Sequence, residues 1–291
     1  MKPAAFKYIR VRSVEETLST LSQYGGEAKI LAGGQSLVPM MNFRVAQPAI
    51  LIDIDPVKEL DYLRVENSWL HVGATTRQRA LEKSLQVREQ CPLLAQAVKW
   101  IGHPQTRNRG TVGGSLVHGD PTAELALVAT LLDARIVIQR KGKSRTVVAA
   151  DFFEDLMTTH IDEDEVLTQA SFPLAPPRSG CGFRELCIRH GDFAIVAAAV
   201  QLTVGEDGRF SDARIAVSGG GPKPLRIHRA EEALVGQQGN GKVFDEAAAC
   251  VPDAVRPMGD QKASEAYRRE MARVFVRRAL EDAWSMMRVK R

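Results

Sequence analysis

Two glycine-rich stretches hold the residues whose types and spacing point most clearly to chemistry. The first reads AGGQSL over residues 32–37, and the second reads GTVGGS over residues 110–115. Glycine has no Cβ, so a backbone that contains it can turn sharply and present its N–H groups to a bulky anion. Backbone N–H groups arranged in this way bind a diphosphate without a lysine. We therefore predict that the two stretches hold the two phosphates of one dinucleotide from opposite sides.

The residues in and after these stretches narrow the type of ligand. Neither stretch is a G-x-G-x-x-G or a G-x-x-x-x-G-K-[ST] motif, which disfavours a nicotinamide-binding Rossmann domain and a P-loop. Most glycine pairs that follow a strand are simple turns, and this is the alternative interpretation. Asp120 and Glu124 follow the second stretch, four residues apart. Their carboxylates suit the hydroxyls of a ribose or ribityl chain, although acidic residues also stabilise the first turn of a helix.

The cysteines and histidines indicate no metal centre. The four cysteines are scattered without a CxxC pair, and the six histidines show neither H-x-H nor H-E-x-x-H spacing. This pattern supports neither an iron–sulfur cluster nor a structural zinc site. The sequence also shows no nucleophile–base pair and no carboxylate pair suited to hydrolysis. We therefore expect no catalytic residue and no metal ligand in this chain, so that a bound cofactor would supply the chemistry.

Composition and charge restrict the compartment and the partners. The N-terminal residues lack the apolar core of a signal peptide, and no segment approaches the roughly 18 apolar residues of a membrane span. We therefore expect a cytoplasmic protein with no integral membrane segment. The net charge is only +4, and arginines between residues 268 and 278 alternate with apolar residues at helical spacing. Because no aromatic stacking platform accompanies them, most of these arginines indicate a solvated helix face and no nucleic-acid partner.

Apolar periodicity and turn residues divide the chain into three units. Residues 1–55 predict a strand, a capped helix, a strand, a loop and a strand, with the strands at 5–11, 29–32 and 50–54. Residues 56–175 predict strands at 69–73, 135–139, 146–149 and 165–172, and helices at 76–85, 92–101 and 122–132. A proline-rich linker at 173–180 leads into residues 176–291, which predict an antiparallel meander at 182–189, 194–204 and 212–218. Helices at 229–235, 243–250 and 264–287 complete this last unit.

Several motifs together resemble a known family. They are AGGQSLVP at 32–39, IGHPQTRNRGTVGGS at 101–115, Asp120-Pro121, RHGDFAIV at 189–196, ASEAYRR at 263–269 and RRAL at 277–280. They are similar to motifs of the FAD-binding medium subunits in the carbon monoxide dehydrogenase / xanthine dehydrogenase family of molybdenum hydroxylases. The resemblance covers nearly the whole chain, and the two glycine motifs are specific when they occur together.

The resemblance implies an α+β fold with a two-lobed FAD-binding domain of the vanillyl-alcohol-oxidase (PCMH) type. A smaller C-terminal domain with a three-stranded antiparallel sheet and helices would follow it. On this basis the N-terminal FAD-binding lobe is predicted at 1–55, the second lobe at 56–175 and the C-terminal domain at 176–291.

FAD is the implied cofactor, and motif position assigns its contacts. The first stretch would surround the pyrophosphate with Leu31, Ala32, Gly33, Gly34, Gln35, Ser36 and Leu37. The opposite side would be closed by Gly110, Thr111, Gly114 and Ser115. Ile101 would pack on the cofactor, and Asp120 and Glu124 would meet its sugar-like hydroxyls.

Three further positions match residues near the cofactor in relatives, namely Leu167, Arg184 and Phe193. We expect either Arg184 or a backbone N–H near the pyrimidine edge of the flavin, where it could stabilise the anionic reduced form. Many relatives have tyrosine in place of Phe193, so this chain would keep the aromatic surface there but lose a hydrogen bond. The alternative interpretation places Phe193 in a hydrophobic core.

The implied activity is electron transfer. A molybdopterin-binding large subunit would oxidise the substrate, and a small subunit with two [2Fe–2S] clusters would relay electrons. The FAD of this chain would pass them to an external acceptor such as NAD, a quinone or oxygen, within a heterotrimer. The alternatives are a stand-alone flavin-dependent oxidoreductase of the same fold, a scaffold subunit without cofactor, and a nucleotide-binding regulatory module. The residues do not specify the substrate.

Overall fold

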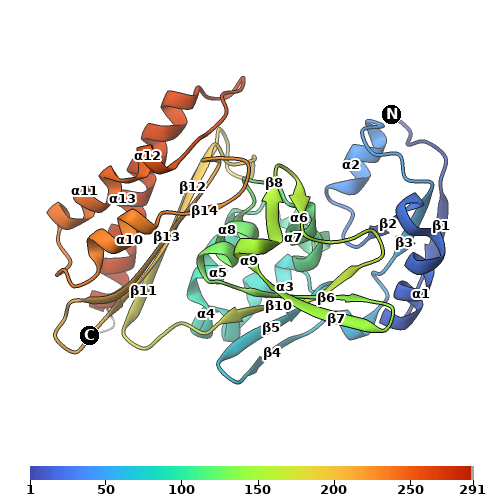
Figure 1. Ribbon diagram of the computed structural model, residues 1–291, viewed down its shortest axis with the longest axis horizontal. Helices are drawn as coiled ribbons and strands as arrows, with labels where there is room; N and C mark the ends of the chain where they lie inside the picture. Colours follow the sequence, from blue (N-terminus) through green and yellow to red (C-terminus); the bar gives the residue numbers. More distant parts are fainter. Residues whose placement is uncertain (290–291) are drawn as a thin grey trace.

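The computed structural model describes residues 1–289 and shows three parts in a row (Figure 1). Each part has its own main sheet. The N-terminal sheet lies within residues 7–53, the middle sheet within 63–173 and the C-terminal sheet within 179–226. None of the helices in residues 1–289 is both long enough and apolar enough to cross a membrane.

The N-terminal part is a parallel three-stranded sheet in the order β1-β3-β2. Its strands are β1 (Lys7–Arg10), β2 (Ala28–Leu31) and β3 (Ile50–Asp53). The predicted capped helix is α1 (Val14–Tyr24), whose N-cap Ser13 accepts a hydrogen bond from the Glu16 backbone N–H at 3.0 Å.

The first glycine stretch leads into a helix where the sequence predicted a loop. This helix is α2 (Leu37–Asn42). The loop prediction was wrong because Pro39 lies in the first turn of α2, where a helix needs no backbone donor from that residue. The helix begins immediately after the glycine pair and Ser36, so those residues form the connection between β2 and α2.

The middle part is an antiparallel sheet in the order β4-β5-β10-β6-β7. Its strands are β4 (Leu63–Glu66), β5 (Trp69–Gly73), β6 (Arg135–Arg140), β7 (Lys143–Val148) and β10 (Val166–Pro173). β4 was missed by the sequence analysis. It pairs with β5 through Asn67 and Ser68, which both have positive φ and form the tight turn.

Short helices cover the middle sheet. They are α3 (Gln78–Lys83), α4 (Leu85–Gln90), α5 (Pro92–Ala97), α6 (Pro104–Arg109), α7 (Val112–His118), α8 (Glu124–Leu131) and α9 (Ala149–Phe152). The predicted helices at 76–85, 92–101 and 122–132 correspond to α3, to α5 with the 3₁₀ turn Val98–Trp100, and to α8. A small hairpin, β8 (Phe153–Asp155) and β9 (Thr158–Thr159), follows α9.

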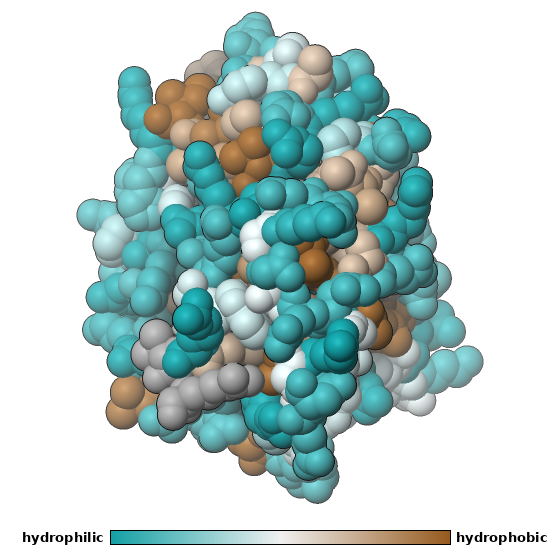
Figure 2. Space-filling model, turned by 90° about the vertical axis from the view of Figure 1, so that its left-hand side faces the viewer, coloured by the Kyte–Doolittle hydropathy of each residue, from teal (hydrophilic) through white to brown (hydrophobic). Residues whose placement is uncertain are grey.

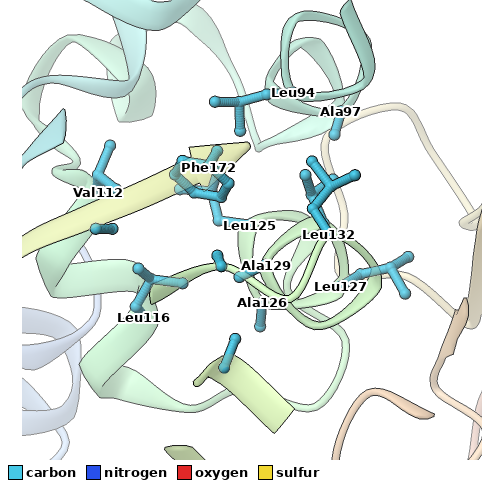
Figure 3. Close-up of a cluster of buried hydrophobic side chains, with 14 of the residues drawn as sticks. Leu94, Ala97, Val112, Leu116, Leu125, Ala126, Leu127, Ala129, Leu132 and Phe172 are labelled. Carbon is cyan, nitrogen blue, oxygen red and sulfur yellow. The ribbon is translucent and has the colours of Figure 1, made fainter. Parts of the chain in front are cut away.

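Helix α8 lies in the centre of the largest hydrophobic core. Residues 125–131 of this helix are all buried. Figure 3 shows its side chain Leu125 beside Phe172 of β10, whereas Leu127 points away from the opposite side of the helix. The helix also contacts β12 and β13 of the C-terminal sheet. An apolar surface all around α8 therefore joins the middle part to the C-terminal part.

The C-terminal part contains the predicted meander and one more strand. The strands are β11 (Ser179–Leu186), β12 (Val196–Val204), β13 (Phe210–Ser218) and the missed two-residue β14 (Leu225–Arg226). The helices are α10 (His228–Leu234), α11 (Gly241–Ala249), α12 (Val251–Ala254) and α13 (Glu265–Val289). Long α13 packs on β11 at glycines, since a Cβ on Gly180 would lie 2.1 Å from the carbonyl oxygen of Ala283.

The outer face of the C-terminal part is mostly hydrophilic (Figure 2). One arginine of α13 departs from the predicted solvated face. Arg268 is 6% exposed, and its guanidinium donates to the carbonyl oxygen of Ile195 at 2.5 Å and to Asp260 at 2.8 Å. A carbonyl and a carboxylate thus accept hydrogen bonds from a cation that the helical pattern placed in solvent.

Candidate cofactor site

A cavity of about 700 Å³ runs between the three parts and is the candidate site. Its volume lies within the range of cavities that hold cofactors. All three parts contribute to its wall. They do so through the first glycine stretch, the second glycine stretch, the start of α8, the segment 157–167 and the loop 191–194.

The two glycine stretches contact each other through their backbones. A Cβ on Gly33 would lie 2.2 Å from the carbonyl oxygen of Arg109 and 2.9 Å from the Cα of Gly110. Only glycine permits this approach. The contact places both stretches on the same cavity, as the sequence analysis predicted from their shared pattern.

The first stretch keeps its backbone donors free. Within residues 1–289, the N–H groups of residues 33–36 donate to no other protein atom. Gly34 has φ +72°, the left-handed conformation that bends the chain here. The amide nitrogen of Gln35 donates back to the carbonyl oxygen of Gly33 at 3.2 Å. Four consecutive unpaired N–H groups beside a cavity are suited to an anion such as a diphosphate.

The second stretch differs from the prediction of a second open nest. It forms the start of α7, whose N-cap Thr111 accepts a hydrogen bond from the Gly114 N–H at 3.1 Å. The N–H groups of Val112 and Gly113 donate to the carbonyl oxygens of Thr76 and Ala74 at 3.0 and 2.9 Å. The protein itself therefore satisfies these donors. The stretch contributes a closely packed wall instead of a row of free donors.

The start of α8 brings two carboxyl groups to the cavity. Asp120 accepts hydrogen bonds from the N–H and hydroxyl of Thr122, both at 2.7 Å. Glu124 is the first residue of α8 and lines the cavity. Burial raises the pKa of Glu124 to about 7, and the charge of Asp120 adds to this effect. Burial also lowers the pKa of neighbouring His118, so this end of the cavity disfavours charge.

Glu185 is a buried acid that the sequence analysis missed. It lies on β11, is 6% exposed, and neither of its carboxyl oxygens has a hydrogen-bond partner among the described residues. Burial, with a smaller contribution from the charge of Glu124, raises the pKa of Glu185 to about 9. Strand alternation predicts only that Glu185 and neighbouring Arg184 face opposite sides, and not which of them is buried.

Two predicted residues lie outside the main cavity. Arg184 pairs with Asp282 of α13 at 2.5 and 2.8 Å, on the face of β11 opposite Glu185. It therefore does not reach the cavity wall. Leu31 lines a smaller cavity of about 380 Å³ on the other side of the first glycine stretch, together with Asp53.

The other predicted residues line the main cavity. They are Ala32, Gly33, Gly34, Gln35, Ser36, Leu37, Ile101, Gly110, Thr111, Gly114, Ser115, Asp120, Glu124, Leu167 and Phe193. Phe193 is 68% exposed at the rim, 5.7 Å from the ammonium of Lys262, and so belongs to no core. Gln78 lines the cavity as well, and its buried side-chain oxygen has no partner within residues 1–289. No sequence signal distinguished Gln78 from an ordinary residue of α3.

Comparison with known proteins identifies the family. Residues 4–175 match the FAD binding domain in molybdopterin dehydrogenase, and residues 182–283 match the CO dehydrogenase flavoprotein C-terminal domain. The chain belongs to this flavoprotein family. FAD is therefore its cofactor, and the fold predicted from the resemblance is confirmed.

Individual relatives align over nearly their whole length. The 6-hydroxypseudooxynicotine dehydrogenase complex subunit alpha of Paenarthrobacter nicotinovorans is 38% identical, over 97% of this chain and 96% of that protein. The carbon monoxide dehydrogenase medium chain of Hydrogenophaga pseudoflava is 35% identical, over 98% and 99%. A solved carbon monoxide dehydrogenase from that organism, lacking the Mo-pyranopterin moiety, contains a similar chain. It has a TM-score of 0.95 and 37% identity, covering 98% of this chain and 99% of that one.

The cavity of this flavoprotein fits FAD by its donors and by its shape. The free N–H groups of residues 33–36 suit the diphosphate, and the unpaired oxygen of Gln78 can accept from a hydroxyl or amine. Asp120 and Glu124 can accept hydrogen bonds from sugar-like hydroxyls, while Ile101 and Leu167 supply apolar wall for a ring. The glycine contact between Gly33 and the Arg109 backbone keeps the two glycine stretches close together.

Proposed function

We propose that this chain is the FAD-binding electron-transfer subunit of a heteromeric molybdenum hydroxylase. It takes electrons from the [2Fe–2S] clusters of a small subunit and passes them to an external acceptor such as NAD, a quinone or oxygen. A molybdopterin-binding large subunit carries the substrate chemistry, and the assembly is a cytoplasmic heterotrimer. The supporting observation is the row of free N–H groups at 33–36, in residues that line a cavity of about 700 Å³ in a chain of this family.

The protein's part in this function is to bind and orient the cofactor, and FAD supplies the redox chemistry when bound. The N–H groups of residues 33–36 hold the diphosphate. The carboxyls of Asp120 and Glu124 accept hydrogen bonds from hydroxyls, and Ile101, Leu167 and Phe193 bound the space for the ring. Burial around Glu124 raises the pKa of its carboxyl to about 7 and so disfavours charge on that side of the cavity.

A stand-alone flavin-dependent oxidoreductase is the second candidate, and one observation favours it. Glu124 lines the cavity with a pKa raised to about 7, which is the range of a general acid or base at neutral pH. In that case the chain alone would turn over a small substrate, and Glu124→Gln would abolish the turnover. As an electron-transfer subunit, the isolated chain would turn over no such substrate.

Purification from the native cells tests the proposal. We expect flavin, iron and molybdenum to co-purify with this chain in one complex, and the flavin to become reduced when the complex meets its substrate. A yellow chain that purifies alone and oxidises a substrate would support the second candidate. A colourless chain that binds no FAD would refute both.

A further inference from the structure

Arg107 is a buried cation directly behind the cavity wall. It lies on α6, is 6% exposed, and forms a two-pronged ion pair with Glu82 of α3. Its Nε lies 2.8 Å from Oε2 of Glu82, and its Nη2 lies 3.2 Å from Oε1. This arrangement lowers the pKa of Glu82, chiefly through the hydrogen bond from Arg107. The charge of Arg107 is thus paired within the protein, and Arg107 is not itself a residue of the cavity lining.

The remaining nitrogen of Arg107 holds the backbone of the cavity wall. Its Nη1 donates to the carbonyl oxygen of Ile101 at 2.9 Å and to that of Gly102 at 3.0 Å. Both residues line the cavity. Gly102 has φ +46°, a left-handed conformation that the two hydrogen bonds help to fix.

A loop of the C-terminal part packs against the same backbone. A Cβ on Gly191 would lie 2.7 Å from Cε1 of His103 and 3.1 Å from the carbonyl carbon of Gly102. Gly191 lines the cavity together with Phe193. The wall is therefore continuous from Ile101 to Phe193, and a movement of Gly102 would displace both loops.

We propose that Arg107 is a positioning residue for the cofactor: it fixes the Ile101–Gly102 backbone and so sets how tightly FAD is held and at what potential it works. This inference rests on the proposed function. The role needs arginine specifically, because a planar guanidinium can pair with a carboxylate and still donate to two carbonyls. A lysine ammonium can replace the ion pair with Glu82 but cannot reproduce both sets of contacts.

The test compares Arg107→Lys with a matched control in the assembled complex. Arg79 also pairs with Glu82, at 2.6 Å, but contacts neither carbonyl, so Arg79→Lys is the control. We expect Arg107→Lys to release FAD at least tenfold faster, to change the visible circular dichroism of the flavin and to shift its midpoint potential. The Arg79→Lys complex should stay within twofold of wild type in FAD release, with unchanged spectrum and potential.

The outcomes separate this inference from the proposed function. If wild type holds FAD and Arg107→Lys matches it in release rate, spectrum and potential, the positioning role is refuted while the proposed function stands. A wild-type complex without FAD overturns the proposed function and this inference together. If Arg107→Lys does not fold, Glu82→Asp provides the second measurement, because it draws the guanidinium back while keeping both charges. Unchanged flavin properties in a folded Glu82→Asp complex would likewise refute the role.

Discussion

Replacing Glu185 with glutamine should flatten the pH dependence of the chain's stability. Glu185 is 6% exposed, its carboxyl oxygens have no partner among the described residues, and burial raises its pKa to about 9. The folded protein therefore keeps a proton there that the unfolded chain, with an ordinary glutamate pKa, has lost. Stability is highest below the unfolded pKa and falls as pH rises, until the folded pKa is reached.

The magnitude follows from proton linkage. Each pH unit over which the folded state holds one extra proton costs about 1.4 kcal/mol of unfolding free energy. Between pH 5.5 and 8.5 Glu185 can thus remove at most about 4 kcal/mol. Glutamine has the same shape as the protonated acid but does not titrate, so the variant lacks this loss. Glu124, with a pKa of about 7, keeps its own smaller contribution in both proteins.

Thermal unfolding of the FAD-free full chain across this pH range measures the effect. The melting temperature of wild type should fall more than that of Glu185→Gln, by roughly 8 °C if 1 kcal/mol corresponds to about 2 °C. The comparison uses the change with pH, so a constant cost of the buried amide cancels. Glu66→Gln alters an exposed carboxylate on β4 and should follow the wild-type curve. Parallel curves for wild type and Glu185→Gln would refute the neutral buried acid.

Two other perturbations test the ion pairs and the glycine contact. Glu165 is buried and pairs with Arg145 at 2.6 and 2.8 Å, and this ion pair lowers the pKa of Glu165. The ion pair stabilises the fold above the ordinary glutamate pKa, and this stabilisation is lost as pH falls through the folded pKa. Glu165→Gln should therefore cost about 1–3 kcal/mol in urea unfolding at pH 7, and a cost that persists undiminished in strong acid would contradict this explanation. Gly33→Ala would place a Cβ 2.2 Å from the Arg109 carbonyl oxygen and should reduce FAD content at least tenfold, whereas Gly221→Ala, whose Cβ would have 3.9 Å of space, should not. Equal flavin content in these two glycine variants would show that the glycine contact is dispensable.

The pattern of glycines indicated which two stretches line the cavity, but it did not indicate how each stretch contributes to the cavity wall. Both stretches line one cavity, and the Gly33–Arg109 contact shows why glycine is needed there. The second stretch nevertheless forms the helix α7, although glycine disfavours helices. The Thr111 cap and the close approach of Gly113 to Ala74, where a Cβ would be 2.7 Å away, outweigh that preference. Tertiary contacts of this kind leave no local sequence signal.

Adjacent residues on β11 show a second limit of sequence reasoning. Alternation along the strand predicts that Arg184 and Glu185 face opposite sides, and they do. Which side each residue takes depends on α13, which covers the Arg184 face and provides Asp282 as its partner. A buried, unpaired carboxyl is unusual enough that a sequence argument places it in solvent. The choice of faces was therefore decided by packing between elements 98 residues apart in the chain.

These limits have a common physical origin in the position of the cavity between three separate sheets. Its wall passes from Gly33 of the N-terminal part to Gly102 of the middle part and on to Gly191 of the C-terminal part. At Gly33 a Cβ would lie 2.2 Å from the Arg109 carbonyl oxygen, and at Gly191 it would lie 2.7 Å from the His103 ring and 3.1 Å from the carbonyl carbon of Gly102. A displacement of any one part would therefore separate close contacts in the cavity wall. The precision of the site thus resides in close contacts between the parts, and Arg107, buried behind the Ile101–Gly102 backbone, is where a substitution should alter the site without touching the cofactor.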